Sequence, residues 1–135
     1  MRLFALLTFM LLALMARGQE GASALDRVNR LVGPDNVLQV KGKQCVLDGS
    51  REGMKVKTDK FSLLDLDPAT LVYDADNRIV SISCFSEMGE CILRQQLTDG
   101  KKNYRWRIAF DVRDSAHANE LMVAFGELVS QIQKK

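Results

Sequence analysis

The sequence predicts an α+β protein: an antiparallel β-roll or barrel of six to seven strands, closed by a C-terminal amphipathic helix and preceded by a short helix. Three observations lead to this fold class. Apolar side chains alternate along residues 104–112, and they recur with helical spacing along residues 118–132. Short apolar runs separated by turn-forming residues fill the chain between positions 37 and 97.

The alternation near the C-terminus has the period of a strand with one buried face. Its apolar members are Tyr104, Trp106, Ile108, Phe110 and Val112. The next apolar residues follow i, i+3, i+4 spacing, which places on one side of a helix Ala118, Leu121, Met122, Phe125, Leu128, Val129 and Ile132. Asp114 or Ser115 can cap the start of that helix. We therefore predict that the helix covers the sheet and that the core contains Trp106, Ile108, Phe110, Leu121, Phe125 and Leu128.

The preceding elements are shorter. A helix is predicted over residues 23–32, because Ser23 and Asp26 resemble a capping box and Gly33-Pro34 is a stop signal. Asp48-Gly49 is expected to be a turn, since both residues tolerate positive φ. Short strands joined by tight turns pair antiparallel. The predicted strands cover residues 37–40, 44–47, 54–58, 71–73, 79–85 and 91–97.

The first eighteen residues have the layout of a secretory signal peptide. Met1-Arg2 supplies a positive start, residues 3–15 form an apolar run, and Ala16-Arg17-Gly18 places small residues where a signal peptidase reads them. An uncleaved N-terminal anchor is the alternative, although the run is short for a permanent span. We expect a secreted or periplasmic protein with a single globular domain over residues 19–135 and no permanent membrane anchor after cleavage.

Removal of this leader changes the charge balance. The leader carries two of the nineteen basic residues and no acidic ones, so the remaining chain has seventeen residues of each sign. A formally neutral domain has no overall field to attract polyanions, and we expect no nucleic-acid partner.

Three cysteines in an exported chain leave one thiol over if two of them pair. Cys84 and Cys91 bracket six residues. If those residues form a hairpin loop, the two cysteines face each other across the ladder at or near disulfide range. A disulfide is one interpretation, and two reduced, buried cysteines are the other. Cys45 is then the possible free thiol.

Residue spacing predicts no catalytic residue, metal site or cofactor. His117 is the only histidine, and three scattered cysteines do not complete the ligand set of a zinc site. A catalytic pair of Cys45 with His117 can be written. However, His117 is expected in the first turn of the terminal helix, on its solvated side.

Two charged clusters have structural explanations. An acidic stretch lacks the glycine and glutamate of a calcium loop, so we interpret its members as turn formers: Asp65, Asp67, Asp74 and Asp76. Arg105 and Arg107 flank Trp106, an arrangement that can mark an anion-binding or nucleic-acid surface. The alternation instead predicts that Trp106 faces inward and that these arginines, with Arg94 on a neighbouring strand, face solvent.

The order of elements resembles the pleckstrin-homology-like superfold, a bent antiparallel barrel whose open end is closed by a C-terminal amphipathic helix. Residues 61–72, 79–93 and 108–132 carry the resemblance, above all the run Ile108-Ala109-Phe110-Asp111-Val112 that leads into the helix. The chain departs from that family in having its only tryptophan, Trp106, on the strand, and in lacking a basic phosphoinositide-binding loop. The resemblance implies a groove between a sheet edge and the helix that accepts a peptide by strand addition.

Two functions from different classes follow. The first is a non-catalytic exported binding or accessory module with an unknown protein or peptide partner. This function is favoured because, once the core is assigned, no cluster of polar residues remains that is typical of an active site. The second is a small enzyme or small-molecule carrier with a pocket at the barrel mouth, for which Cys45 is the best reactive group.

Overall fold

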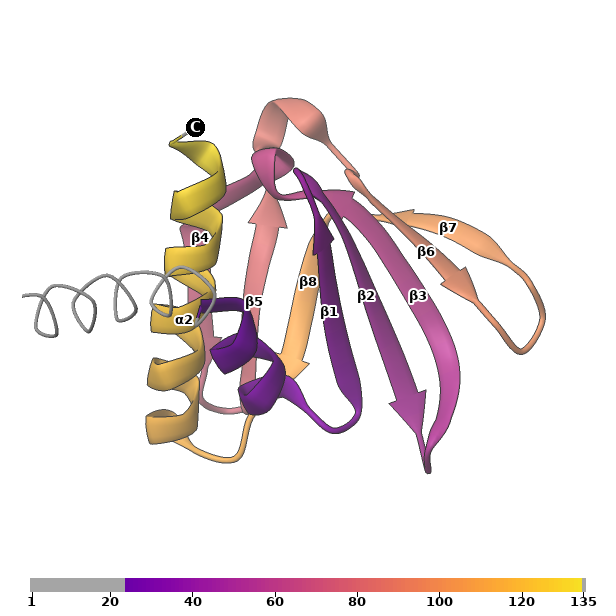
Figure 1. The fold of residues 1–135 in the computed structure, drawn as a ribbon, viewed down its shortest axis with the longest axis horizontal. Helices are drawn as coiled ribbons and strands as arrows, with labels where there is room; N and C mark the ends of the chain where they lie inside the picture. The colour runs from indigo at the N-terminus through magenta and orange to yellow at the C-terminus, as the bar shows by residue number, and fades with distance from the viewer. Residues whose placement is uncertain (1–23, 135) are drawn as a thin grey trace, which may run out of the picture.

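The structure is a computed structural model that describes residues 24–134, and the predicted signal peptide and Ser23 lie outside this range. Eight strands form two antiparallel sheets with the helix α2 packed beside them (Figure 1). The larger sheet has the order β1 (Asn36–Lys41), β2 (Gln44–Arg51), β3 (Met54–Ser62), β6 (Ile92–Gln96), β7 (Lys102–Arg105). The smaller sheet has the order β4 (Leu66–Asp74), β5 (Ile79–Cys84), β8 (Arg107–Asp111). The predicted α+β class is confirmed, with the sheets forming an open roll and not a closed barrel. Residues 24–134 contain eight strands where six to seven were predicted, because residues 104–112 contribute to two strands.

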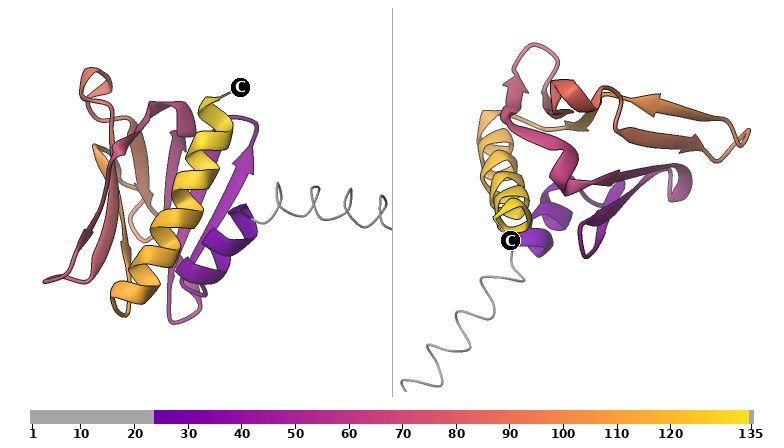
Figure 2. Two further views of the ribbon diagram at one scale, coloured as in Figure 1. Left: turned by 90° about the vertical axis from the view of Figure 1, so that its left-hand side faces the viewer. Right: turned by 90° about the horizontal axis from the view of Figure 1, so that it is seen from above.

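Helix α2 (Ser115–Gln133) closes one side of the roll, as its apolar stripe predicts. Asp114 caps it by accepting a hydrogen bond from the His117 N–H at 2.8 Å. At the other end the Gln133 side-chain amide donates to the carbonyls of Leu63 and Leu66. Figure 2 shows α2 lying beside both β4 and the N-terminal helix. Neither helix within residues 24–134 is long and apolar enough to cross a membrane.

The N-terminal helix, described over residues 24–32, covers the outer edge of β1. It ends where the Gly33 N–H donates to the Asn29 carbonyl. The Asn29 side chain then accepts from the Leu38 N–H at 2.7 Å and donates to the Leu38 carbonyl at 2.9 Å. These two bonds replace the bonds that a neighbouring strand would make, so this edge of the larger sheet is closed at Leu38.

Five of the six predicted core residues are buried, with exposures of 6 % or less: Ile108, Phe110, Leu121, Phe125 and Leu128. The prediction for Trp106 is wrong, because its side chain is 55 % exposed. The predicted strand 104–112 is in fact two strands that pair in different sheets, and Trp106 forms the bend between them. The apolar residues continue to alternate through the bend. However, those on β7 face solvent and those on β8 face the core.

The expected turn at Asp48-Gly49 is also wrong, since β2 continues through it to Arg51. The chain reverses at Glu52 and Gly53, which have φ values of 53° and 78°. Asp48 contributes to pairing instead of turning: it accepts from the Thr58 hydroxyl at 2.9 Å and lies 3.2 Å from the Lys55 ammonium.

The sulfur atoms of Cys84 and Cys91 are bonded at 2.05 Å, and Cys45 is free and buried. The hairpin that we expected between the two bonded cysteines is absent, because β5 and β6 belong to different sheets. The disulfide instead joins the two points where the chain leaves the smaller sheet and enters the larger one.

Candidate functional site

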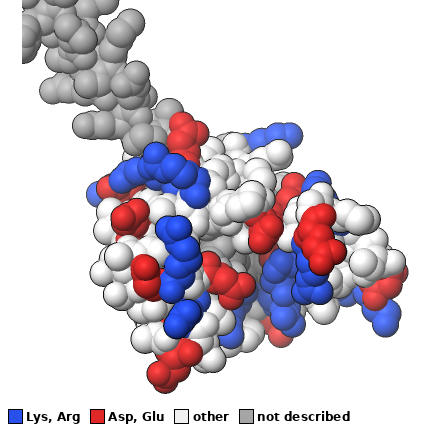
Figure 3. Space-filling model, turned by 90° about the horizontal axis from the view of Figure 1, so that it is seen from below, with Lys and Arg blue, Asp and Glu red and all other residues white. Residues whose placement is uncertain are grey.

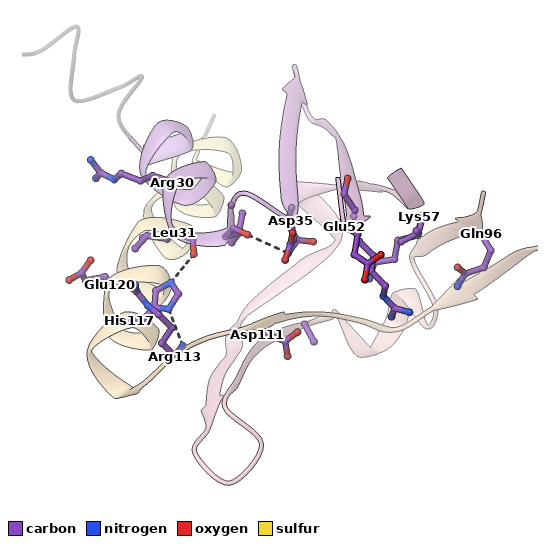
Figure 4. A pocket seen from close by; sticks show the side chains of 18 residues that line it. Arg30, Leu31, Asp35, Glu52, Lys57, Gln96, Asp111, Arg113, His117 and Glu120 are labelled. Carbon is purple, nitrogen blue, oxygen red and sulfur yellow. Dashed lines mark hydrogen bonds between the residues drawn. The ribbon is translucent and has the colours of Figure 1, made fainter. Parts of the chain in front are cut away.

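The open end of the roll contains a groove of about 1140 Å³. Its walls come from the end of the N-terminal helix, the β2–β3 hairpin, β6, β8 and the start of α2 (Figure 4). Figure 3 shows this end of the molecule, where basic and acidic side chains surround the hollow. The charged lining residues are Arg30, Arg51, Lys57, Arg113, Asp35, Glu52, Asp111 and Glu120.

One side of the groove is a row of residues that oppose one another across four strands. Asn36 of β1 is opposite Gly49 of β2, Gly49 is opposite Lys57 of β3, and Lys57 is opposite Gln96 of β6. All four line the groove. Lys57 has the same phase along β3 as the buried Asp59, so this row continues the inner face of the larger sheet toward the opening.

The missing side chain at Gly49 makes room for Lys57. A Cβ atom at position 49 would lie 3.0 Å from Lys57 Cγ and 2.8 Å from Lys57 Cε, so the aliphatic stem of Lys57 lies against the glycine. Burial lowers the pKa of Lys57, and the Arg94 guanidinium lowers it further, while Asp59 and Asp111 offset part of this shift. No hydrogen bond or ion pair joins the Lys57 ammonium to another group within residues 24–134.

A buried ion pair lies next to Lys57. The Asp59 side chain is fully buried, and its two oxygens accept from Arg94 Nε at 2.8 Å and Arg94 Nη2 at 3.0 Å. This carboxylate raises the pKa of Arg94 above its ordinary value. The expectation that Arg94 faces solvent is therefore wrong, because Asp59 holds it on the inner face of the sheet. Arg105 and Arg107 are exposed, as predicted.

His117 joins the two helices at the groove wall and is not the solvated residue that we expected. Its Nδ1 accepts from the Arg113 N–H at 3.1 Å, and Nε2 lies 2.7 Å from the Leu31 carbonyl (Figure 4). Because Nδ1 accepts, the ring hydrogen is on Nε2 and donates to Leu31. This half-buried ring thus fixes the start of α2 against the end of the N-terminal helix.

Two hydrogen bonds fix the phase of pairing between β5 and β8. The Val112 N–H donates to the Arg78 carbonyl, and the Cys84 N–H donates to the Trp106 carbonyl. In an antiparallel pair such hydrogen-bonded residues alternate with residues whose N–H and C=O groups point away from the partner. The even-numbered residues of β8 therefore bond to β5, and the odd-numbered ones do not.

The other edge of β8 is consequently open. The backbone groups of Arg107, Ala109 and Asp111 point away from β5, and no strand within residues 24–134 pairs with this edge. Ala109 and Asp111 also line the groove, where both are exposed. The groove thus contains unpaired backbone donors and acceptors from β8, opposite the polar row of the larger sheet.

Asp74 and Asp76 lie at the turn between β4 and β5, as predicted, whereas Asp65 belongs to a 3-10 helix (Leu63–Asp65) and Asp67 to β4. Asp74 accepts from the backbone N–H of Asp76 and from the side-chain amide of Asn77, and the Asn77 bonds lower the pKa of Asp74. Asp67 accepts from the Ala69 N–H. Within residues 24–134 no three histidine, cysteine or acidic side chains gather closely enough to hold a metal ion.

Cys45 lies in the core and does not line the groove. Burial raises its pKa to about 12. We expect the thiol of the folded protein to react with a disulfide reagent at pH 8 at least about a hundredfold more slowly than free cysteine, because the thiolate is the reactive form. Titration with Ellman's reagent, with and without denaturant, measures this ratio. A fast reaction in native buffer would contradict this expectation and would support the alternative of an enzyme that uses Cys45 as its reactive group.

Replacing Lys57 with Met should raise the urea midpoint at pH 7, because it removes a charge whose burial opposes folding. The folded pKa of Lys57 lies below the unfolded value of about 10.4, so this cost is present below the folded pKa and disappears as pH rises toward 10.4. The gain should therefore shrink as pH rises. Lys55→Met, at an exposed position on the same strand, is the control and should show no such trend.

A groove or pocket was expected at the open end of the roll, but sequence reasoning did not identify the residues that line it. The signal available was the phase of β3, since Lys57 falls two residues before Asp59 and four before the buried Phe61. Its neighbours across the sheet, Asn36 and Gln96, can be identified only once the strand order and register are known.

No protein-family model, curated protein or solved structure matches this chain. The groove is therefore the feature of the molecule from which its function is inferred.

Proposed function

We propose that this protein is an exported, non-catalytic binding module that holds an extended segment of a protein partner in the groove, as an added strand on the open edge of β8. The observation that carries the proposal is the row of unpaired backbone groups at Arg107, Ala109 and Asp111, two of which line the groove. Strand addition supplies affinity through main-chain hydrogen bonds and specificity through the neighbouring side chains.

The contrast between the two strand edges supports this proposal. A long unpaired edge invites aggregation, and proteins commonly cover such edges. Here the Asn29 side chain satisfies the edge of β1 at Leu38, whereas no strand within residues 24–134 pairs with the outer edge of β8. A strand-addition site requires an open strand edge beside a groove. The edge of β8 meets this requirement, whereas the edge of β1 does not.

The lining of the groove favours an extended peptide over a small molecule. Sites for small molecules are lined mostly by apolar and aromatic side chains with a few polar groups. This groove has eight charged lining residues and no aromatic ring other than that of His117. The Cys84–Cys91 disulfide supports the proposed export, because such bonds persist in oxidising compartments. The two-sheet roll with its terminal helix supports the relationship to PH-like domains, which we also propose.

Hydrogen exchange in the free protein should distinguish the two faces of β8. We expect the Phe110 and Val112 amides, which point toward β5, to be protected, and the Ala109 and Asp111 amides to exchange at least about tenfold faster. Residue-resolved NMR exchange measures all four. Equal protection of the four amides would mean that the edge is already covered, and the proposal would fail.

The binding experiment uses a library of displayed twelve-residue peptides selected on the purified protein. Ala109→Pro removes one N–H and blocks the edge, and the fold should tolerate it because that N–H faces away from β5. Ala109→Val keeps the N–H and is the matched control. Selected peptides should bind Ala109→Pro at least about tenfold more weakly, and Ala109→Val nearly unchanged. Equal binding to the proline variant, with its fold verified by near-UV circular dichroism, contradicts strand addition at β8.

A further inference from the structure

We propose that Lys57 forms a carboxylate-binding subsite in the groove, so that the bound segment places an acidic side chain or its C-terminal carboxylate beside Gly49. This inference rests on the proposed function for the identity of the ligand as a peptide. It adds the chemical class of group that the peptide must present and the residue that recognises it.

The position of Lys57 is built into the larger sheet. Its stem lies against Gly49, and any side chain larger than hydrogen at position 49 would occupy the same space. The φ angle of Gly49 is not positive, so its backbone conformation does not require glycine. The contact with Lys57 therefore explains why position 49 has no side chain. The ammonium group is thereby held over the inner face of the sheet, where burial keeps it partly out of water.

The carboxylates closest in sequence and register to Lys57 are committed to other partners. Asp59 accepts two hydrogen bonds from Arg94, and Asp48 pairs with Lys55 at 3.2 Å. The Lys57 ammonium has no hydrogen bond or ion pair in the described part of the chain, and Asp59 and Asp111 act on it only by longer-range attraction that raises its pKa. A half-buried ammonium that no carboxylate contacts directly gains the most from an anion that arrives with the ligand.

The neighbours of Lys57 fit a carboxylate. Gln96 is opposite it on β6 and lines the groove, and its side-chain amide has no hydrogen bond within residues 24–134, so it can donate to the second carboxylate oxygen. The groove carries four acidic side chains against four Lys or Arg side chains, so its formal charge is balanced and it lacks the net positive field that would favour a doubly charged phosphate over a singly charged carboxylate. Phosphate recognition also commonly uses clustered arginines, whereas Lys57 is a single point charge.

Two variants separate the charge of Lys57 from its position. Lys57→Gln removes the charge and keeps a polar side chain of similar length. Gly49→Ala keeps the charge and displaces the lysine stem, because its Cβ would lie 2.8 Å from Lys57 Cε. If the subsite exists, both variants weaken carboxylate recognition, whereas Lys55→Gln on the same strand leaves it unchanged.

Peptide selection is the first arm of the test. Peptides selected on the parent protein should be enriched in Asp or Glu at one position, and those selected on Lys57→Gln should lose this enrichment. A synthetic selected peptide should lose at least about tenfold in affinity when that residue becomes Asn or Gln. If loss follows amidation of the C-terminus instead, the C-terminal carboxylate is the group bound. Equal sequence profiles on the parent and Lys57→Gln would overturn the subsite while leaving strand addition intact.

Sodium acetate titration is the second arm and does not depend on peptide binding. The Lys57 side-chain NMR signals should shift saturably with acetate, more strongly than with inorganic phosphate, and Gly49→Ala should weaken that response severalfold. If no library peptide binds but this response is present, the proposed function fails and the subsite stands. A linear response equal to that of Lys55 would overturn the subsite.

Discussion

Replacing Arg94 with Met is expected to destabilise the folded protein by about 3–5 kcal/mol, a large part of the ~5–15 kcal/mol that holds such a domain together. The reason is the buried carboxylate that the variant leaves behind. Asp59 has no exposed surface, and both of its hydrogen-bonding partners in the structure are nitrogens of Arg94. Urea unfolding followed by tryptophan fluorescence and circular dichroism measures the change.

Two controls make this prediction specific. The double variant Asp59→Leu/Arg94→Met should recover most of the loss, because apolar replacement of both partners of a buried pair is often neutral or stabilising. Lys55→Met removes the exposed partner of Asp48 and should cost at most about 1 kcal/mol. If Arg94→Met costs no more than Lys55→Met, Asp59 is solvated in the folded protein and the polar row beside it is not part of a closed sheet.

The fold class was predictable because its main signals are local. The stripe from Ala118 to Ile132 requires only helical spacing, and the cap at Asp114 requires only the next three residues. Trp106 was misplaced because alternation reports which residues share a side of a strand and not which sheet the strand joins. The chain changes sheet at that residue, so the same apolar phase is exposed on β7 and buried on β8.

The residues that line the groove could not be predicted, because they come together only through the pairing register of distant strands. Asn36 and Gln96 are sixty residues apart in the sequence. Together with Gly49 and Lys57 they form one row only after four strands have paired in the observed order. The open edge of β8 likewise depends on which of its two hydrogen-bonding phases faces β5. The disulfide prediction reached the right pair of cysteines through the wrong local structure, because crossing between sheets brings Cys84 and Cys91 together as effectively as a hairpin would.

Replacing Phe125 with Ala is expected to cost about 3–5 kcal/mol, because it removes a large buried ring and leaves a cavity. Phe125 is 1 % exposed at the middle of α2, one turn from Leu121 and Val129. Its ring centroid lies 5.9 Å from that of Phe110, with the planes tilted by 57°. This pair joins α2 to β8, and such aromatic contacts contribute about 0.5–1.5 kcal/mol beyond their buried area. The variant should unfold at much lower urea concentration and become sensitive to protease.

Val123 provides the matched control on the same helix. It lies two residues before Phe125 and is 57 % exposed, so Val123→Ala should change stability by less than about 0.5 kcal/mol. The difference between the two variants therefore isolates the face of α2 that packs on the sheet. Because Phe110 belongs to β8, loss of this contact should also loosen the strand whose other edge we propose as the binding site, and the Phe110 amide should lose protection in Phe125→Ala. If the urea midpoints of both variants equal that of the parent, α2 does not close the roll, and the arrangement that positions the β8 edge beside the groove is wrong.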